Sequence, residues 1–201
     1  MEKTNKIKTI FIDCGSNLGQ GYTNLTNTLQ LENDEVYMFE PSKYCYEKLI
    51  EKYSNNSNIH LNQKAVWNKN EKRILNIEFC PIEEGFYGGA TNILMENFKI
   101  LDRDIPLMDE WPPKEFDVVE CIDLSQFIRE NIDLNQNIIL KIDIEGAEYE
   151  VIDKLIEDDT LKYINTIAVE WHPDMRKDNC KDISYYVNEF TKNNVKYVEW
   201  F

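Results

Sequence analysis

The chain has few of the residues that mark a nucleic-acid-binding or a secreted protein. Basic residues are scarce, because 22 Lys and Arg stand against 37 Asp and Glu and leave a formal charge of −15. Such a surface repels phosphate backbones, and no strong basic cluster is visible, so we predict no nucleic-acid partner. The five cysteines stand far apart without a CxxC pair, which predicts reduced thiols and no disulfide framework.

Long apolar runs are also missing. No run approaches the ~20 residues that a membrane-spanning helix needs. The first residues, MEKTNKIKTIFID, pass from a short polar lead into a strand-like run, without the apolar core of a secretory signal. We therefore expect a cytoplasmic chain without a membrane span, and its 201 residues suit a single domain over residues 1–201.

Apolar strand-like runs and helical stretches alternate along most of the sequence. The expected strands are residues 7–13, 35–40, 59–61, 138–143, 167–171 and 195–201. The expected helices are residues 20–29, 42–53 with Ser42 as its N-cap, 124–130, 147–157 and 183–192. This alternation predicts an α/β fold with a doubly wound, mostly parallel sheet.

The alternation breaks between residues 65 and 131. Residues 73–79 (RILNIEF) and 116–122 (FDVVECI) read as extra strands inserted between the third and fourth strands of the sheet. Between them lie a glycine-bearing loop, EEGFYGGATNI, and a proline-rich loop, IPLMDEWPP. Long loops in a compact domain are usually functional, so we expect the insertion, at about residues 68–122, to provide a lid over the ligand.

Carboxylates stand at or near the ends of four expected strands, at Asp13, Glu40, Asp143 and Glu170. In a doubly wound sheet the carboxyl ends of the strands share one edge. Ligands bind at that edge, near the point where the strand order reverses. The four acids therefore predict a ligand site there.

The stretch FIDCGSNLG follows the first strand and carries Gly15 and Gly19. Glycines let a ligand approach the backbone, and the next helix offers its free N–H groups. Glu40, one strand later, can accept hydrogen bonds from both hydroxyls of a ribose, which indicates a nucleoside. Asn17 stands where a dinucleotide-binding loop has its second glycine, which disfavours a pyrophosphate ligand.

Five segments of the chain follow one another in the order FIDCGSNLGQ, VYMFEPS, AVWN, ILKIDIEGAEYEVI and IAVEWH. The loop alone resembles the first motif of class I methyltransferases, and the five segments together resemble the FkbM-like methyltransferases over residues 7–172. KIDIEGAE is the most specific part, because general class I methyltransferases do not share it. The resemblance implies a Rossmann-like sheet of the class I methyltransferase type. It further implies S-adenosylmethionine as cofactor and O-methylation of a hydroxyl on a sugar, glycan or secondary metabolite.

The resemblance also implies roles for individual residues. The implied cofactor-binding residues are Asp13, Gly15, Ser16, Asn17, Gly19, Glu40, Ala65 and Asp143. Among them, Glu40 would bind the ribose, Ala65 would lie near the adenine, and Asp143 would face the sulfonium. The catalytic candidates are Asp143, Glu145, Glu170 and His172. His172 could be the general base, because imidazole titrates near neutral pH, or its ring could only hydrogen-bond and pack after the strand.

Two other functions stay open. One is an NAD(P)-dependent sugar oxidoreductase or epimerase on a similar sheet, which the missing middle glycine of the loop disfavours. The other is a non-catalytic nucleoside-binding module, against which the acids Asp143 and Glu170 argue. The spacing of Asp143, Glu170 and His172 matches no compact metal motif, so we predict no resident metal.

The expected partner is a small-molecule or glycan acceptor. Phe86, Tyr87 and Trp111 of the insertion could stack on a sugar face, or could form a small cluster under the loops. Class I sheets usually carry two strands after the fifth, whereas only residues 195–201 look like one here, so we expect the final antiparallel hairpin to be absent or incomplete. Trp200 and Phe201 would then be buried or form a subunit contact, which makes a homodimer possible.

Overall fold

The computed structural model describes residues 7–29, 35–82, 85–93, 115–175 and 180–200, with the backbone alone at 77–82, 85–92 and 115–116. Six strands form one sheet in the order β10-β9-β8-β1-β2-β3, and every neighbouring pair is parallel. They are β1 (Thr9–Cys14), β2 (Glu35–Phe39), β3 (Ile59–Asn62), β8 (Asn137–Ile142), β9 (Thr166–Val169) and β10 (Lys196–Glu199). The strand order reverses between β1 and β8, as in a doubly wound fold.

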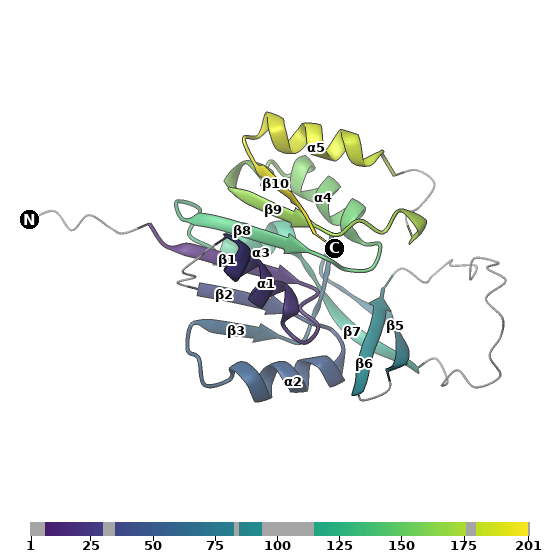
Figure 1. Ribbon diagram of the computed structural model, residues 1–201. Coiled ribbons are helices and arrows are strands. Elements are labelled where there is room, and N and C mark those ends of the chain that lie inside the picture. Colours follow the sequence, from purple (N-terminus) through teal and green to yellow (C-terminus); the bar gives the residue numbers. More distant parts are fainter. Residues whose placement is uncertain (1–6, 30–34, 83–84, 94–114, 176–179, 201) are drawn as a thin grey trace, which may run out of the picture.

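Helices cover both faces of this sheet (Figure 1). They are α1 (Gln20–Leu29), α2 (Lys43–Tyr53), α3 (Leu124–Asn131), α4 (Glu148–Glu157) and α5 (Ile183–Lys192), with short 3-10 turns η1 (Leu161–Tyr163) and η2 (Pro173–Met175). Successive residues of β1 point to opposite faces: Phe11 packs with Leu25 of α1 and Leu49 of α2. Ile10 and Ile12 belong to the cluster that α3, α4 and α5 bury on the other face.

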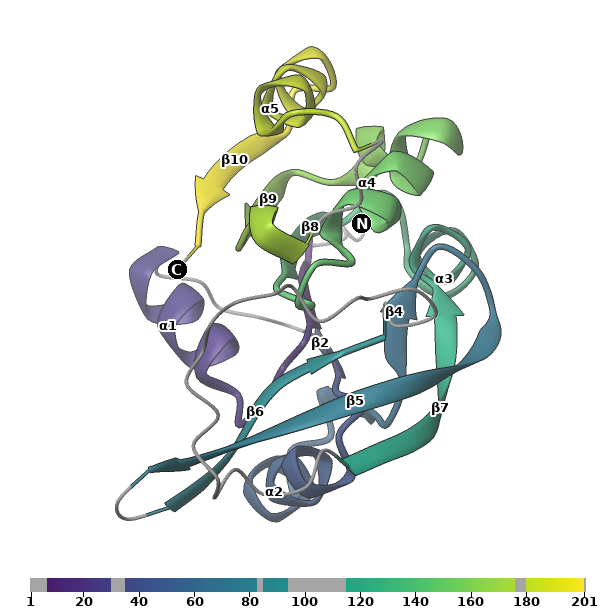
Figure 2. The ribbon, with the colours of Figure 1, turned by 90° about the vertical axis from the view of Figure 1, so that its right-hand side faces the viewer.

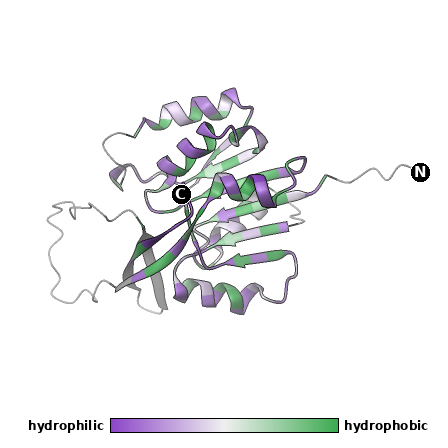
Figure 3. Cartoon of the chain, turned by 180° about the vertical axis from the view of Figure 1, so that it is seen from behind, coloured by the Kyte–Doolittle hydropathy of each residue, from purple (hydrophilic) through white to green (hydrophobic). Residues whose placement is uncertain are grey.

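The hydropathy of the elements agrees with this layering. Figure 3 shows hydrophobic colour along much of the sheet, while the helices alternate between hydrophilic and hydrophobic bands. Strands buried on both faces read as near-continuous apolar runs, and a helix with one buried face reads as a periodic one. The predicted fold class is therefore confirmed.

The insertion forms a second sheet in the order β4-β7-β5-β6. Its strands are β4 (Ala65–Trp67), β5 (Glu71–Ile82), β6 (Gly85–Asn92) and β7 (Glu115–Asp123). Figure 1 shows this sheet beyond the carboxyl ends of β1, β2 and β3, and Figure 2 looks onto β5, β6 and β7 from that side. The insertion thus stands at the edge where the fold binds ligands.

Two details of the insertion differ from the sequence prediction or lie outside it. The stretch EEGFYGGATNI was expected as a loop, but its residues 85–92 form β6, which pairs antiparallel with β5. Glycine disfavours strands locally, and the ladder with β5 supplies the partners that override this preference. IPLMDEWPP with Trp111, and the side chains of Phe86 and Tyr87, lie outside the described residues.

The ends of several elements also differ from expectation. β1 runs on through Asp13 to Cys14, so Asp13 is fully buried within the strand instead of standing free at its tip. Ser42 does occupy the N-cap position of α2, but its side chain makes no capping hydrogen bond. In the described part of the chain one strand, β10, follows β9 and pairs parallel with it, as expected for a sheet without the final antiparallel hairpin.

Candidate cofactor and active site

The loop after β1 has an unusual backbone. Gly15, Asn17 and Gly19 have φ angles of 75°, 46° and 83°, in the left-handed region that glycine and asparagine tolerate best. At Gly15 a side chain is also excluded by space, since a Cβ would lie 1.8 Å from the carbonyl oxygen of Asp143. The glycine therefore lets the loop pack directly against the carboxyl end of β8.

Glu40, which follows β2, ties this loop to the neighbouring strand. Its Oε2 accepts a hydrogen bond from the Asn17 N–H at 2.7 Å, and its Oε1 accepts one from the Ser42 N–H at 2.8 Å. The side chain is buried, and burial raises the pKa of Glu40 to about 7, against the opposing effect of these two N–H groups. Each carboxylate oxygen keeps a second lone pair for a ligand hydroxyl.

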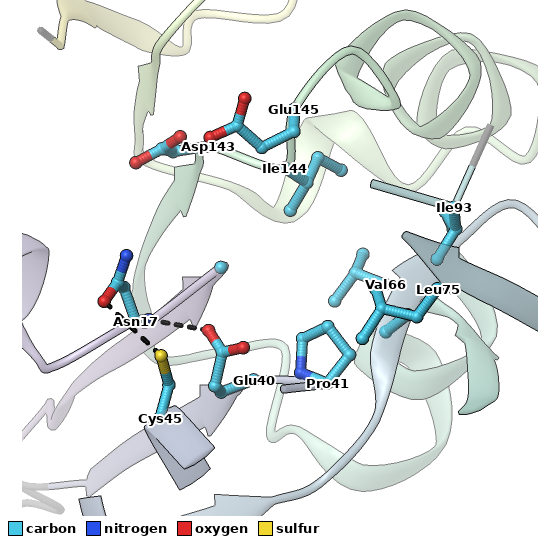
Figure 4. Close-up of a pocket in the computed structure, with 12 residues that line it drawn as sticks. Asn17, Glu40, Pro41, Cys45, Val66, Leu75, Ile93, Asp143, Ile144 and Glu145 are labelled. Carbon is cyan, nitrogen blue, oxygen red and sulfur yellow. Dashed lines mark hydrogen bonds between the residues drawn. The ribbon is translucent and has the colours of Figure 1, made fainter. Parts of the chain in front are cut away.

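A pocket opens between Glu40 and the insertion. In Figure 4, Asn17 and Glu40 lie on one side of it, and Asp143 and Glu145 lie across from them. The remaining labelled side chains form a largely apolar wall: Pro41, Cys45, Val66, Leu75, Ile93 and Ile144. Ala65, predicted near the adenine, also lines this pocket. An apolar wall next to one buried carboxylate suits a nucleoside, whose base is flat and whose sugar carries hydroxyls.

A second hollow adjoins the same loop and is mostly polar. Its lining residues are Gly15, Ser16, Asn17, Gln20, Gly21, Asn24, Lys141, Asp143, Glu170 and Trp200. It shares Gly15, Asn17 and Asp143 with the first pocket. The two hollows therefore meet at the loop, so one elongated ligand could place an apolar end in the first and a polar end in the second.

Lys141 is buried beside the loop and the two carboxylates that flank it. Its Nζ lies 3.3 Å from Asp13 Oδ1 and 3.1 Å from Asp143 Oδ2, and donates to the Gly15 carbonyl at 2.6 Å. Burial alone would lower the pKa of Lys141, but the two carboxylates outweigh it and raise that pKa above its usual value. Burial likewise raises the pKa of Asp13, whose carboxylate lines neither hollow. Asp13 and Lys141 thus support the loop from below.

Four acids gather around His172 at the ends of β8 and β9. His172 Nε2 lies 3.4 Å from Glu145 Oε2 and 3.9 Å from Glu170 Oε1. Its Nδ1 is 2.9 Å from Glu148 Oε1, and Asp143 completes the group because its carboxylate lies within 4.8 Å of the facing atoms of Glu170 and His172. We call Asp143, Glu145, Glu170 and His172, backed by Glu148, the acidic edge.

Burial and the neighbouring charges shift the pKa values of the groups in the acidic edge. Burial opposes a charged imidazole, but the hydrogen bond and charge of Glu148 outweigh it and raise the pKa of His172 to about 9. Burial raises the pKa of Glu145 to about 7, and the nearby His172 cation opposes that shift. The pKa of Glu170 is also raised, by burial and then by the Asp143 charge. This edge favours a bound cation, because carboxylates outnumber the bases there.

Glu148 is the functional candidate that sequence reasoning missed. Its side chain is fully buried at the start of α4, and its Oε1 accepts from the N–H groups of Ile144 and Gly146 at 3.0 and 3.2 Å as well as facing His172. It lies in the KIDIEGAE segment, but an acid in the first turn of a helix is ordinary. Only the fold places His172 against it.

A profile of the methyltransferase FkbM domain matches residues 13–197. The chain belongs to the FkbM methyltransferase family. The FkbM methyltransferase of Methylobacillus flagellatus KT, known from a crystal structure, is similar with 14% sequence identity and a TM-score of 0.43. That likeness covers 76% of this chain and 30% of the other, so the chain spans under a third of that protein's length. No curated protein matches.

This FkbM domain brings most of the predicted site residues together. Eight of them line one or both hollows: Gly15, Ser16, Asn17, Glu40, Ala65, Asp143, Glu145 and Glu170. Glu145 lines the first pocket and contacts His172. Gly19 lines neither hollow and instead packs near the Tyr53 ring. Among the described residues, no helix has the length and apolar character to span a membrane.

Proposed function

We propose that this FkbM domain transfers a methyl group from S-adenosylmethionine to a hydroxyl group of a small-molecule or glycan acceptor. The observation that carries the proposal is the pair of hollows that meet at Gly15, Asn17 and Asp143, one with an apolar wall beside Glu40 and the other mostly polar. Such a shape suits a ligand with a nucleoside at one end and an amino acid at the other.

The residues fit this cofactor one part at a time. The free lone pairs of Glu40 would accept the two ribose hydroxyls, and the wall with Val66, Leu75 and Ile93 would hold the adenine. The polar hollow, where Ser16 and Lys141 lie, would take the ammonium and carboxylate of the methionine end. Asp143, at the junction, would then stand near the sulfur, where a negative charge attracts a sulfonium.

When bound, the cofactor supplies a methyl group activated by a positively charged sulfur. The protein's part is to hold the acceptor hydroxyl in line with that group and to receive its proton. With the cofactor bound, the acceptor hydroxyl would take up the methyl group and give its proton to a carboxylate of the acidic edge, leaving the sulfur neutral. Glu145 and Asp143 line the pocket and are placed for this. The proposed lid, the insertion with β5 and β6, would exclude water from the acceptor.

Calorimetric titration with S-adenosylhomocysteine, in the presence of a chelator, tests the cofactor assignment. We expect micromolar-range binding, and Glu40→Gln should weaken it roughly 10- to 100-fold because hydrogen bonds to a charged, buried group are lost. Glu47→Gln, an exposed acid on α2, is the matched control and should bind as the unchanged protein does. Absence of binding, or equal binding by all three proteins, would refute the assignment.

The same titration with NADH tests the alternative function, an NAD(P)-dependent oxidoreductase or epimerase. A dinucleotide needs close backbone approach at the position of Asn17, and the side chain there obstructs it. NADH binding tighter than that of S-adenosylhomocysteine would favour the oxidoreductase. Transfer of a tritiated methyl group onto a panel of sugars and glycans would then identify the acceptor, and the absence of any transfer with the cofactor bound would favour a binding module.

A further inference from the structure

We propose that Asp143, Glu170 and His172 form a site for a divalent transition-metal ion such as Mn²⁺. The sequence spacing of these residues predicts no metal site, so the inference depends on how the fold assembles them. It deepens the proposed function and rests on it for the ion's role in catalysis, whereas binding of the ion can be tested without any cofactor.

The distances between the three donors suit such an ion. One ligand atom from each residue lies within 4.8 Å of the other two, and His172 Nε2 is 3.9 Å from Glu170 Oε1. Ligands at ~2.1 Å from a metal stand about 3 Å apart when adjacent and about 4.2 Å apart when opposite. Small side-chain movements therefore suffice to bring the three atoms around one ion. Lys141 Nζ lies 3.1 Å from Oδ2 of Asp143, so one oxygen of this carboxylate faces a cation of the protein.

The orientation of His172 is the second observation that points to a metal. Glu148 Oε1 holds the Nδ1 side of the ring at 2.9 Å and is itself fastened by the N–H groups of Ile144 and Gly146. The other ring nitrogen, Nε2, consequently faces Glu170 and Glu145. A histidine held through one nitrogen by a buried carboxylate, with the other nitrogen presented to further ligands, is the arrangement that metal-binding histidines use.

The charge around the site is also unbalanced. Glu148 is fully buried, and its Oε2 has no hydrogen-bond partner. In the described part of the chain, His172 is the cation that Glu145, Glu148 and Glu170 share, while Lys141 divides its charge between Asp143 and Asp13. Buried carboxylates that lack a matching number of cations destabilise the folded state. A divalent ion at Asp143, Glu170 and His172 would balance them.

The donor set indicates which class of ion would bind. Carboxylate oxygens suit Mg²⁺ and Mn²⁺, whereas an imidazole nitrogen favours transition metals, so two oxygens with one nitrogen select ions such as Mn²⁺. Three protein donors leave coordination positions open toward the hollows that Asp143 and Glu170 line. In the proposed reaction an acceptor oxygen placed there would lose its proton more readily, and it would lie beside the methyl donor.

Electron paramagnetic resonance of Mn²⁺ added to the cofactor-free protein tests the site. The free-ion signal should fall as one site fills in the micromolar range at 0.15 M NaCl, and pulsed spectra should show coupling to an imidazole nitrogen. His172→Gln should abolish that coupling and weaken binding at least 10-fold. His60→Gln is the matched control, because His60 is the second of only two histidines and lies on β3; it should change neither result.

Glu148→Gln tests the orienting role. It keeps the size of the side chain but weakens the hold on Nδ1, so Mn²⁺ affinity should fall roughly 10- to 100-fold while circular dichroism stays unchanged. Binding without nitrogen coupling, binding equal in the unchanged protein and His172→Gln, or no binding in the millimolar range would each overturn the proposal. Those outcomes leave binding of S-adenosylhomocysteine in chelator unaffected, so the metal site and the proposed function fail separately.

Discussion

The two ends of the site differ in how far their carboxylates are matched by hydrogen-bond donors and cations. The proposed nucleoside end is the side of the first pocket where Glu40 stands next to a largely apolar wall, and both oxygens of Glu40 already accept backbone N–H groups. The acidic edge has four carboxylates around His172, and they share few donors. A satisfied, rigid end suits recognition of a fixed molecule, whereas an end with unbalanced charge suits chemistry in which cations bind and protons move. The first pocket lies between the two, because Glu40 lines one side of it and Asp143 and Glu145 line the other.

Replacing Lys141 should produce the largest effect, because this residue compensates charge between the two ends. Lys141→Met leaves Asp13 fully buried without its cation, so the free energy of unfolding should fall by about 3–5 kcal/mol. Urea unfolding at pH 8 measures it. The double variant Asp13→Asn with Lys141→Met should recover part of the loss, because the orphaned charge is gone. A single variant as stable as the unchanged protein would show that the pair does not support the loop.

Substitutions at Asn17 should have a smaller effect, confined to the loop. Its φ of 46° is strained for a β-branched residue, so Asn17→Val should be about 1–2 kcal/mol less stable than Asn17→Gly, which tolerates this backbone. Urea unfolding of the two variants makes the comparison, and both keep the N–H that Glu40 accepts. Equal stability would mean that the loop can relax to another conformation.

The smallest expected effect is the pH dependence of the nucleoside end. Burial raises the pKa of Glu40 to about 7, so this carboxyl is mostly protonated at pH 6 and mostly ionised at pH 8. Ribose hydroxyls donate to the ionised form, hence affinity for S-adenosylhomocysteine should rise about 10-fold between these pH values. Calorimetry at both pH values measures the change.

Other titrating groups require a control for that experiment. Glu145 has its pKa raised to about 7, and Lys141 and Asp13 also act on Glu40. Glu40→Gln removes only the Glu40 contribution, so its affinity should be nearly flat between pH 6 and 8. A variant that keeps the full 10-fold rise would assign the pH dependence to the acidic edge instead.

Much of the fold could be predicted because its signals are local. Helices α1 and α5 begin and end at the predicted residues, and the parallel strands were recognisable as apolar runs. β6 was not, because its glycines carry no strand signal and its stability comes from pairing with β5. The sequence also did not predict that Leu75 and Ile93 line the pocket. Both residues come from the insertion, whose position depends on strand pairing.

The candidate site also has features that the sequence predicted and features that it did not. The order of the segments around Gly15, Glu40 and Asp143 was enough to predict which edge of the sheet carries the candidate site, because a doubly wound sheet brings the carboxyl ends of its strands together. The sequence could not say that Asp13 lies buried beneath the loop against Lys141, or that Glu148 holds His172.

What the sequence by itself determined is therefore the layered parallel sheet, the family and the edge that carries the acids, because periodicity and strand order encode them directly. The tertiary structure alone decided the grouping of Asp143, Glu170 and His172 within 4.8 Å, and their support by a buried carboxylate. Distances of a few ångströms between side chains on different strands depend on register and packing, and no local pattern in the chain records them.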